Sequence, residues 1–145
     1  MGPRRKGRIL AVQSLFAYDF TQCPVNNLTC FSWVKDEKNS ASANENIRSF
    51  ASLLITGTIE NLQTIDSIIK KHLENWDFNR LNRLDLAVLR ISIFSFLFMK
   101  DVPVSVVIDE AVSIAKDFGT DDSYKFINGV LDGARKSLEK NHEST

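Results

Sequence analysis

The sequence contains few of the residues that build catalytic or metal centres. Among its 145 residues are 2 cysteines and 2 histidines. Cys23 and Cys30 lack the C-x-x-C spacing of a zinc site, and two cysteines do not make a disulfide scaffold. His72 and His142 lie in a lysine-rich segment and in the C-terminal tail, where a solvated position is the simpler interpretation. We therefore expect no metal site and no catalytic centre, and the cysteine content favours a reduced, cytoplasmic compartment.

Long apolar runs and an excess of charge of one sign are also missing. The most apolar stretch, Ile91–Met99, is far shorter than the roughly 18 residues that a membrane span requires. Residues 1–20 begin like a signal peptide, but polar residues interrupt them and no small-x-small cleavage site follows. The GxGxxG, Walker and HExxH motifs are absent from the sequence, so we expect no cofactor. Because 18 Lys and Arg balance 18 Asp and Glu, any affinity for nucleic acid must be local.

Apolar residues recur at steps of three and four along nearly the whole chain, which is the period of an α-helix. The first predicted helix covers residues 5–20, and its apolar stripe consists of Ile9, Val12, Phe16 and Phe20. A short helix is predicted near residues 31–34, and two helices with a break at Gly57 are predicted between residues 47 and 73. Residues 81–99 are apolar almost all round, which is typical of a helix in the middle of a bundle.

Two further helices are indicated by residues that suit helix ends. Pro103 suits a first helical turn, and Gly119 suits a left-handed C-cap. Asp121 or Asp122 can then cap the last helix. We predict an all-α fold, a single-domain bundle of about six or seven helices. Its parts are one helical domain over residues 1–145, a basic N-terminal arm over residues 1–8 and a frayed tail over residues 139–145.

The basic charges at the start of the chain are the strongest sign of a function. Arg4, Arg5, Lys6 and Arg8 precede the first acidic residue of the sequence. Four cations have the wrong sign for a helix N-terminus, where the helix dipole favours anions. Gly7 weakens a helix further, by up to about 1 kcal/mol relative to alanine. These residues alone support phosphate binding and an inert basic flank about equally.

Four segments favour the first of these two interpretations. They are RRKGRILAVQSLF, LDLAVLRISIF, DVPVSVVIDEAVSIAKDFG and DDSYKFINGVLDGARK. Because these segments occur in this order and at this spacing, the chain resembles the NusB family of bacterial transcription antitermination factors. The resemblance is weakest between Thr21 and Trp76. The resemblance implies a helical RNA-binding protein without catalytic activity. It would bind single-stranded boxA-type RNA of ribosomal RNA leaders together with NusE, a small-subunit ribosomal protein, and join the RNA polymerase antitermination complex.

The resemblance also implies which residues bind. Matching positions for RNA are Arg4, Arg5, Lys6, Arg8, Gln13, Phe16, Asp122, Lys125, Phe126 and Asn128. At Asp122 the implied effect is repulsion of phosphate, which restrains affinity. Asp85 matches an acidic position on the face that receives the ribosomal protein. Gly7 stands where the family usually has alanine, which predicts a looser arm.

Each of these positions also has a simpler structural interpretation. Phe16 continues the stripe of the first helix, so that core packing is favoured over base stacking there. Phe126 is in a similar position, Asn128 can bond to a neighbouring backbone group, and Asp85 is as readily a solvated charge. Two other functions stay open: a protein-binding helical adaptor, and a detached RNA-docking module of a ribosomal RNA methyltransferase. A homodimer that uses the partner face is also open.

Overall fold

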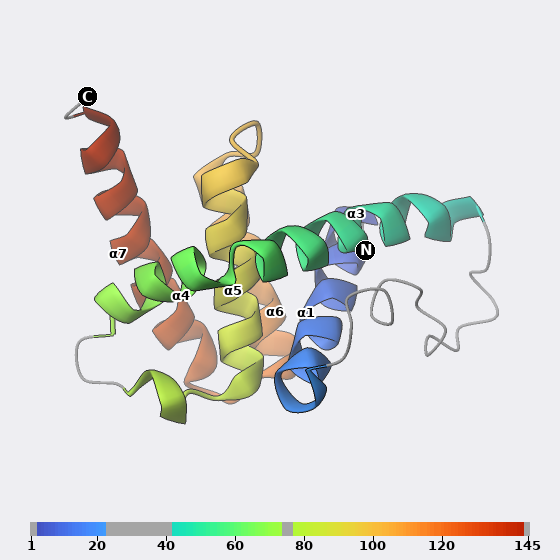
Figure 1. Cartoon of the computed structure of the whole chain (residues 1–145), viewed down its shortest axis with the longest axis horizontal. Coiled ribbons are helices and arrows are strands. Elements are labelled where there is room, and N and C mark those ends of the chain that lie inside the picture. The colour runs from blue at the N-terminus through green and yellow to red at the C-terminus, as the bar shows by residue number, and fades with distance from the viewer. Residues whose placement is uncertain (1–2, 23–41, 74–76, 144–145) are drawn as a thin grey trace.

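The central element of the protein is α5, over Arg83–Phe98. The computed structural model describes residues 3–22, 42–73 and 77–143, so that the helix predicted near residues 31–34 and both cysteines lie outside the described residues. The other elements are α1 (Pro3–Thr21), α3 (Ser42–Glu60), α4 (Leu62–Lys71), the short 3-10 helix η2 (Phe78–Arg80), α6 (Val104–Phe118) and α7 (Ser123–Glu143). Every other α-helix of the described residues packs against α5 (Figure 1).

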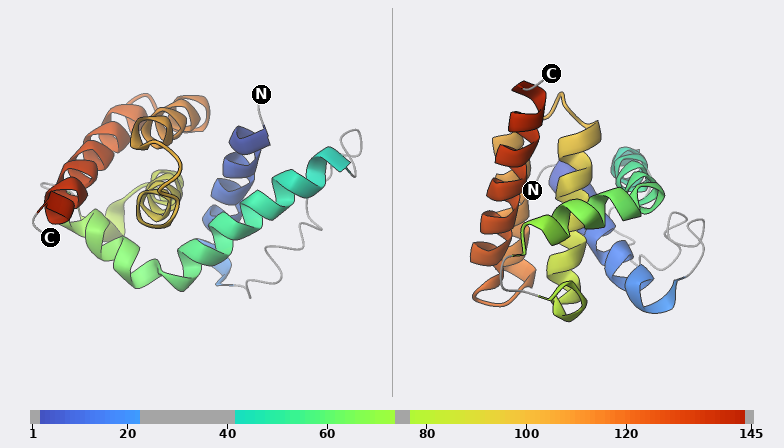
Figure 2. Two further views of the ribbon diagram at one scale, coloured as in Figure 1. Left: turned by 90° about the horizontal axis from the view of Figure 1, so that it is seen from above. Right: turned by 60° about the vertical axis from the view of Figure 1, so that its left-hand side comes forward.

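The helices form two pairs on either side of α5. α1 packs along α3, and α6 packs along α7, while α4 connects the α3 side to α5 and α7 (Figure 2). The predicted all-α bundle is confirmed, with six α-helices and no strand among the described residues. None of these helices combines the length and the apolar character needed to cross a membrane.

The apolar sequence of α5 explains its central place. All residues from Asp85 to Phe96 are buried, including Val88 and Ile91, which the sequence predicts to be core. The helix begins after Asn82, whose Oδ1 accepts hydrogen bonds from the backbone N–H groups of Leu84 (2.8 Å) and Asp85 (3.4 Å). These bonds satisfy two of the donors that a helix start leaves free.

Two glycines have roles other than the predicted ones. α3 continues through Gly57 to Glu60, and a Cβ at Gly57 would lie 2.3 Å from the Phe94 ring, so this glycine lets α3 approach α5. Gly119 does end α6, but its φ of −96° is not left-handed. A Cβ there would lie 2.7 Å from Ser123 Oγ and 2.8 Å from the carbonyl oxygen of Ala115. In both places the glycine is required by lack of space.

The two ends of α7 were predicted unequally well. The backbone carbonyl of Asp122 accepts the first helical hydrogen bond, from the N–H of Phe126 at 3.2 Å, so the predicted start is confirmed. At the other end α7 continues to Glu143, so residues 139–143, which the sequence predicts as a tail, belong to the helix.

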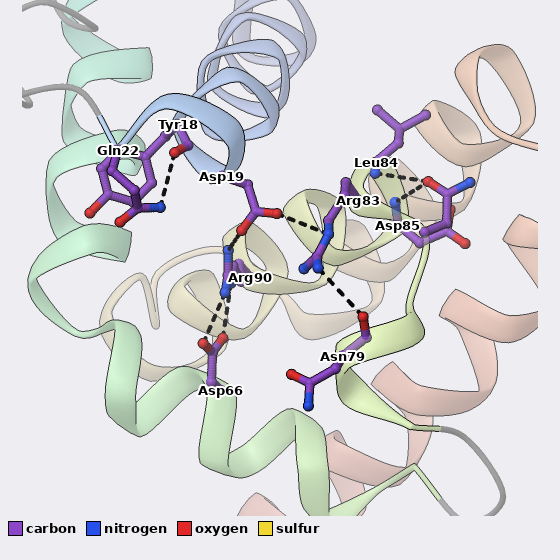
Figure 3. A network of polar contacts seen from close by, with 10 residues as sticks. Tyr18, Asp19, Gln22, Asp66, Asn79, Arg83, Leu84, Asp85 and Arg90 are labelled. Atoms are coloured by element: carbon purple, nitrogen blue, oxygen red, sulfur yellow. Dashed lines mark hydrogen bonds and ion pairs between the residues drawn. The ribbon is translucent and has the colours of Figure 1, made fainter.

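One buried arginine connects three helices. Arg90 of α5 is 7% exposed and binds Asp66 of α4 through two hydrogen bonds, each 2.9 Å long (Figure 3). Its Nη1 also lies 3.4 Å from Asp19 Oδ1 of α1, and Asp19 in turn pairs with Arg83 Nε at 3.0 Å. The bidentate geometry and the second carboxylate supply the partners that a buried guanidinium needs.

Replacing Arg90 tests this connection. Arg90→Ala leaves Asp66 without its bidentate partner and Asp19 with Arg83 alone, and breaking a buried pair costs about 3–5 kcal/mol. We expect a large fall in the midpoint of chemical denaturation. Arg80→Ala is the matched control, because that side chain is 89% exposed and its pair with Asp77 spans 4.0 Å. Similar midpoints for the two variants would contradict the role given to Arg90.

Candidate nucleic-acid interface

The basic start of the chain is part of α1, whose helix begins at Pro3. Residues 3–8, predicted as a basic arm, are therefore the first turns of this helix. Gly7 explains the close contact between α1 and α3, because a Cβ there would lie 2.6 Å from Cδ2 of Phe50. Since successive helical residues point about 100° apart, the four cations face different surroundings. Arg4 and Lys6 are exposed, Arg5 is half-buried and Arg8 is buried.

Arg8 is a structural residue of the bundle. Its side chain is only 4% exposed, and its Nη1 donates to Ser95 Oγ of α5 at 3.2 Å. The guanidinium also lies 5.6 Å from the centre of the Phe50 ring. Burial lowers the pKa of Arg8, although the charge of Glu110 opposes this effect. Arg8, which the resemblance matches to an RNA-binding position, is buried instead, because α1 turns this position toward α5.

Arg5 connects α1 to α6. Its Nη1 donates to Ser113 Oγ, its Nη2 donates to Asp117 Oδ2, and Glu110 Oε2 lies 3.8 Å from Nη1. The Arg5 side chain is 18% exposed. Three groups of α6 thus hold the guanidinium that the sequence predicts to be available for phosphate.

A cleft between α6 and α7 adjoins Arg5. Ser113, which accepts from Arg5, lines this cleft together with Lys116, Tyr124, Lys125 and Asn128. The Nζ atoms of Lys116 and Lys125 lie 4.9 Å and 5.9 Å from the centre of the Tyr124 ring. Two cations on one aromatic ring provide a surface suited to a base with its phosphates. The structure therefore brings the predicted residues Lys125 and Asn128 close to Arg5.

A second recess contains Gln13 and Phe16. Its other lining residues are Asn82, Leu84, Phe118, Gly119 and Thr120. Phe16 is 39% exposed and Phe118 is 50% exposed, so the preference for core packing of Phe16 is wrong. The reason is the rotation of α1, whose buried apolar residues are Ala11, Val12 and Leu15. Helical periodicity could not separate these two faces, because both contain apolar residues.

The remaining predicted residues lie at the start of α7 or at its packing face. Asp122 is exposed at the N-terminus of α7, whereas Phe126 is half-buried and packs against the core. Sequence reasoning missed Lys116, Tyr124 and Phe118, which line the cleft or the recess. Phe118 looks in the sequence like the last residue of an apolar stripe, and no pattern distinguishes it from core. Among the described residues, no group of three or more His, Cys, Asp or Glu could hold a metal ion.

Asp85 is not a solvated charge, which was one of the two equal interpretations of this residue. It is 7% exposed in the first turn of α5, and its Oδ1 has no hydrogen-bond partner among the described residues. Burial raises the pKa of the Asp85 carboxyl, and the nearby Ser123 hydroxyl partly opposes this rise. A contact with a partner protein would therefore require access to a carboxylate beneath the surface.

Comparisons with known proteins agree with this fold. The model of the NusB family matches residues 5–136. The transcription antitermination protein NusB of Treponema pallidum (strain Nichols) is 51% identical over 92% of this chain and 93% of its own. The structure of T. maritima NusB is 39% identical with a TM-score of 0.76, over 94% of this chain and 92% of that one. A crystal structure of the antitermination factors NusB and NusE with double-stranded RNA contains a chain that is 27% identical with a TM-score of 0.80, over 94% of this chain and 98% of that one.

The buried carboxyl group predicts how stability depends on pH. The folded state holds the Asp85 proton more tightly than the unfolded chain does, because the ordinary pKa of this carboxyl is 3.8 and burial raises it. The contribution of Asp85 to the stability of the wild type should therefore fall as the pH rises from that value through the folded pKa, and stay lower above it. We expect Asp85→Asn to melt higher than wild type at pH 7, with a difference that shrinks toward pH 3.8. Asp101→Asn, at an exposed position, is the control. A lower melting temperature of Asp85→Asn at pH 7 would show that the ionised carboxylate stabilises the fold.

Proposed function

This chain belongs to the NusB family, and we propose that it is a transcription antitermination factor that binds single-stranded boxA-type RNA together with NusE. The observation that supports this proposal most directly is the surface built by α1, α6 and α7. Exposed cations of all three helices contribute to it, namely Arg4, Lys6, Lys116 and Lys125. Arg4 lies over the Phe50 ring of α3, and Lys116 and Lys125 lie over the half-buried Tyr124 ring. Cations that hold phosphates, with aromatic rings on which bases stack, are the features that single-stranded RNA requires.

The individual RNA contacts follow from exposure. Arg4 and Lys6 hold phosphates, because their side chains face solvent on the first turns of α1. Lys125 and Asn128 act at the α6–α7 cleft, and Gln13 and Phe16 offer hydrogen bonds and a stacking surface at the second recess. Phe126 supports the cleft from its half-buried position, and Asp122 restrains affinity by repelling phosphate. Arg8, in contrast, supports the interface from within the bundle.

NusE binds near the N-terminal end of α5 in this proposal. Asp85 lies there with an unpartnered Oδ1, and a cation of the partner protein could neutralise it. The same region could be used by a second copy of the chain, so a homodimer would compete with NusE. The protein works by recruitment to RNA polymerase in the cytoplasm, and it carries out no chemistry of its own.

Dependence on the partner protein tests the function. A chain without net charge should bind RNA moderately by itself, and NusE should raise the affinity by linking two binding events. We would measure fluorescence anisotropy of a boxA-type single strand, a scrambled strand and a duplex, each with and without NusE. We expect the largest gain for the boxA-type single strand. Equal affinities for RNA with and without NusE would contradict recruitment. A chain that binds NusE but has no affinity for any of the RNA strands would favour the protein adaptor.

Salt dependence tests the phosphate contacts. Arg4→Ala and Lys6→Ala combined should flatten the log–log salt dependence of RNA binding by about 1.4, since each contact to a single strand contributes about 0.7. Binding to matched and scrambled RNA should weaken alike, because phosphate contacts do not read sequence. Thermal stability should hold, because both side chains are exposed.

The matched control removes two exposed lysines from another helix, Lys70 and Lys71 of α4. It changes the net charge equally, so it separates a local contact from a general effect of charge. If the double variant of Arg4 and Lys6 has the same log–log salt slope of RNA binding as the control, the start of α1 is an inert flank.

A further inference from the structure

The ion pair between Arg5 and Asp117 places a carboxylate inside the proposed RNA surface. Asp117 lies in the last turn of α6, where the helix dipole disfavours an acidic side chain. It is nevertheless the acceptor for Nη2 of Arg5, while Ser113 accepts from Nη1. Arg5 belongs to the same two helical turns as Arg4 and Lys6, and Ser113 lines the cleft that contains Lys125.

A phosphate group would compete for the same donors. Carboxylate and phosphate both accept paired hydrogen bonds from a guanidinium, so they are alternative partners of Arg5. Of the acidic groups beside Arg5, Asp117 is the easier one to displace, since its side chain is 51% exposed. Glu110 is 30% exposed, and its charge also acts on Arg8. After displacement of Asp117, Ser113 and Glu110 would still hold the guanidinium at the edge of the cleft.

We propose that Asp117 sets the affinity for RNA by competing with a phosphate for the Arg5 guanidinium. This inference rests on the proposed function and adds a residue to it that the sequence did not single out. In the free protein Arg5 is bound by α6, and in the complex it exchanges the Asp117 carboxylate for a phosphate oxygen. Part of the binding free energy is then used to break an internal ion pair. The affinity of the chain for RNA is correspondingly lower than its number of cations indicates.

A double-mutant cycle tests the competition. Asp117→Ala removes both the charge and the acceptor, and we expect RNA binding to tighten about two- to fivefold, the effect of one partly exposed ion pair. The salt dependence should steepen by up to about 0.7, because the released Arg5 contact is no longer offset. In an Arg5→Ala background the same Asp117→Ala change should have almost no effect. Asp101→Ala, at an exposed position in the turn between α5 and α6, controls for the change of net charge.

The other outcomes overturn the proposal in different ways. Unchanged or weaker RNA binding of Asp117→Ala would show that Arg5 only connects α1 to α6. An equal gain with and without Arg5 would show that Asp117 merely repels phosphate. If the wild type binds RNA but the double-mutant cycle shows no coupling between Arg5 and Asp117, this inference alone is wrong. If neither the wild type nor any variant binds RNA, the proposed function is wrong as well. Thermal unfolding shows which variants are folded, and Arg5→Gln, which keeps a donor for Ser113, replaces Arg5→Ala if the latter unfolds.

Discussion

The ion pair of Arg90 with Asp66 and Asp19 is the constraint on which the arrangement of the helices depends. α5 is apolar almost all round, and a buried guanidinium within it is tolerated only with charged partners at the right geometry. Those partners come from α4 and from the C-terminal part of α1, so all three helices must meet at this point (Figure 3). Because α1 is a continuous helix, the anchor at Asp19 also fixes Arg4, about 22 Å away along the helix axis. The core thus positions the first turns that face RNA.

Composition and periodicity were sufficient for the fold class but not for the side-chain surroundings. The apolar character of α5 identified the central helix correctly, since a helix without a polar face must be covered on all sides. The faces of α1 were assigned wrongly, because Arg8 is buried and Phe16 is exposed. An arginine counts as polar in any pattern, although it can be buried when a hydroxyl such as that of Ser95 accepts its hydrogen bond. Such pairs join residues far apart in the sequence, and no local pattern contains them.

The same limit applies to charge. Four cations in five residues look like one basic patch, but in a helix they point in different directions. Arg8 faces α5, Arg5 faces α6, and Arg4 and Lys6 face solvent. Asp85 is the opposite case, because an acid near a helix start looks like a favourable surface charge and is instead buried. Counting charges therefore overestimates the number of phosphate ligands and underestimates how many charges hold the bundle together.

The most informative departure from the sequence-based site concerns α6. No residue of Val104–Phe118 was among the predicted RNA contacts, yet this helix lines both recesses and binds Arg5. Ser113 and Lys116 line the cleft toward α7, Phe118 lines the recess toward Phe16, and Asp117 holds Arg5. α6 is placed by its packing on α5 and α7, and Arg5 connects its exposed side to α1. Both recesses therefore share α6, and this helix joins the two parts of the candidate interface.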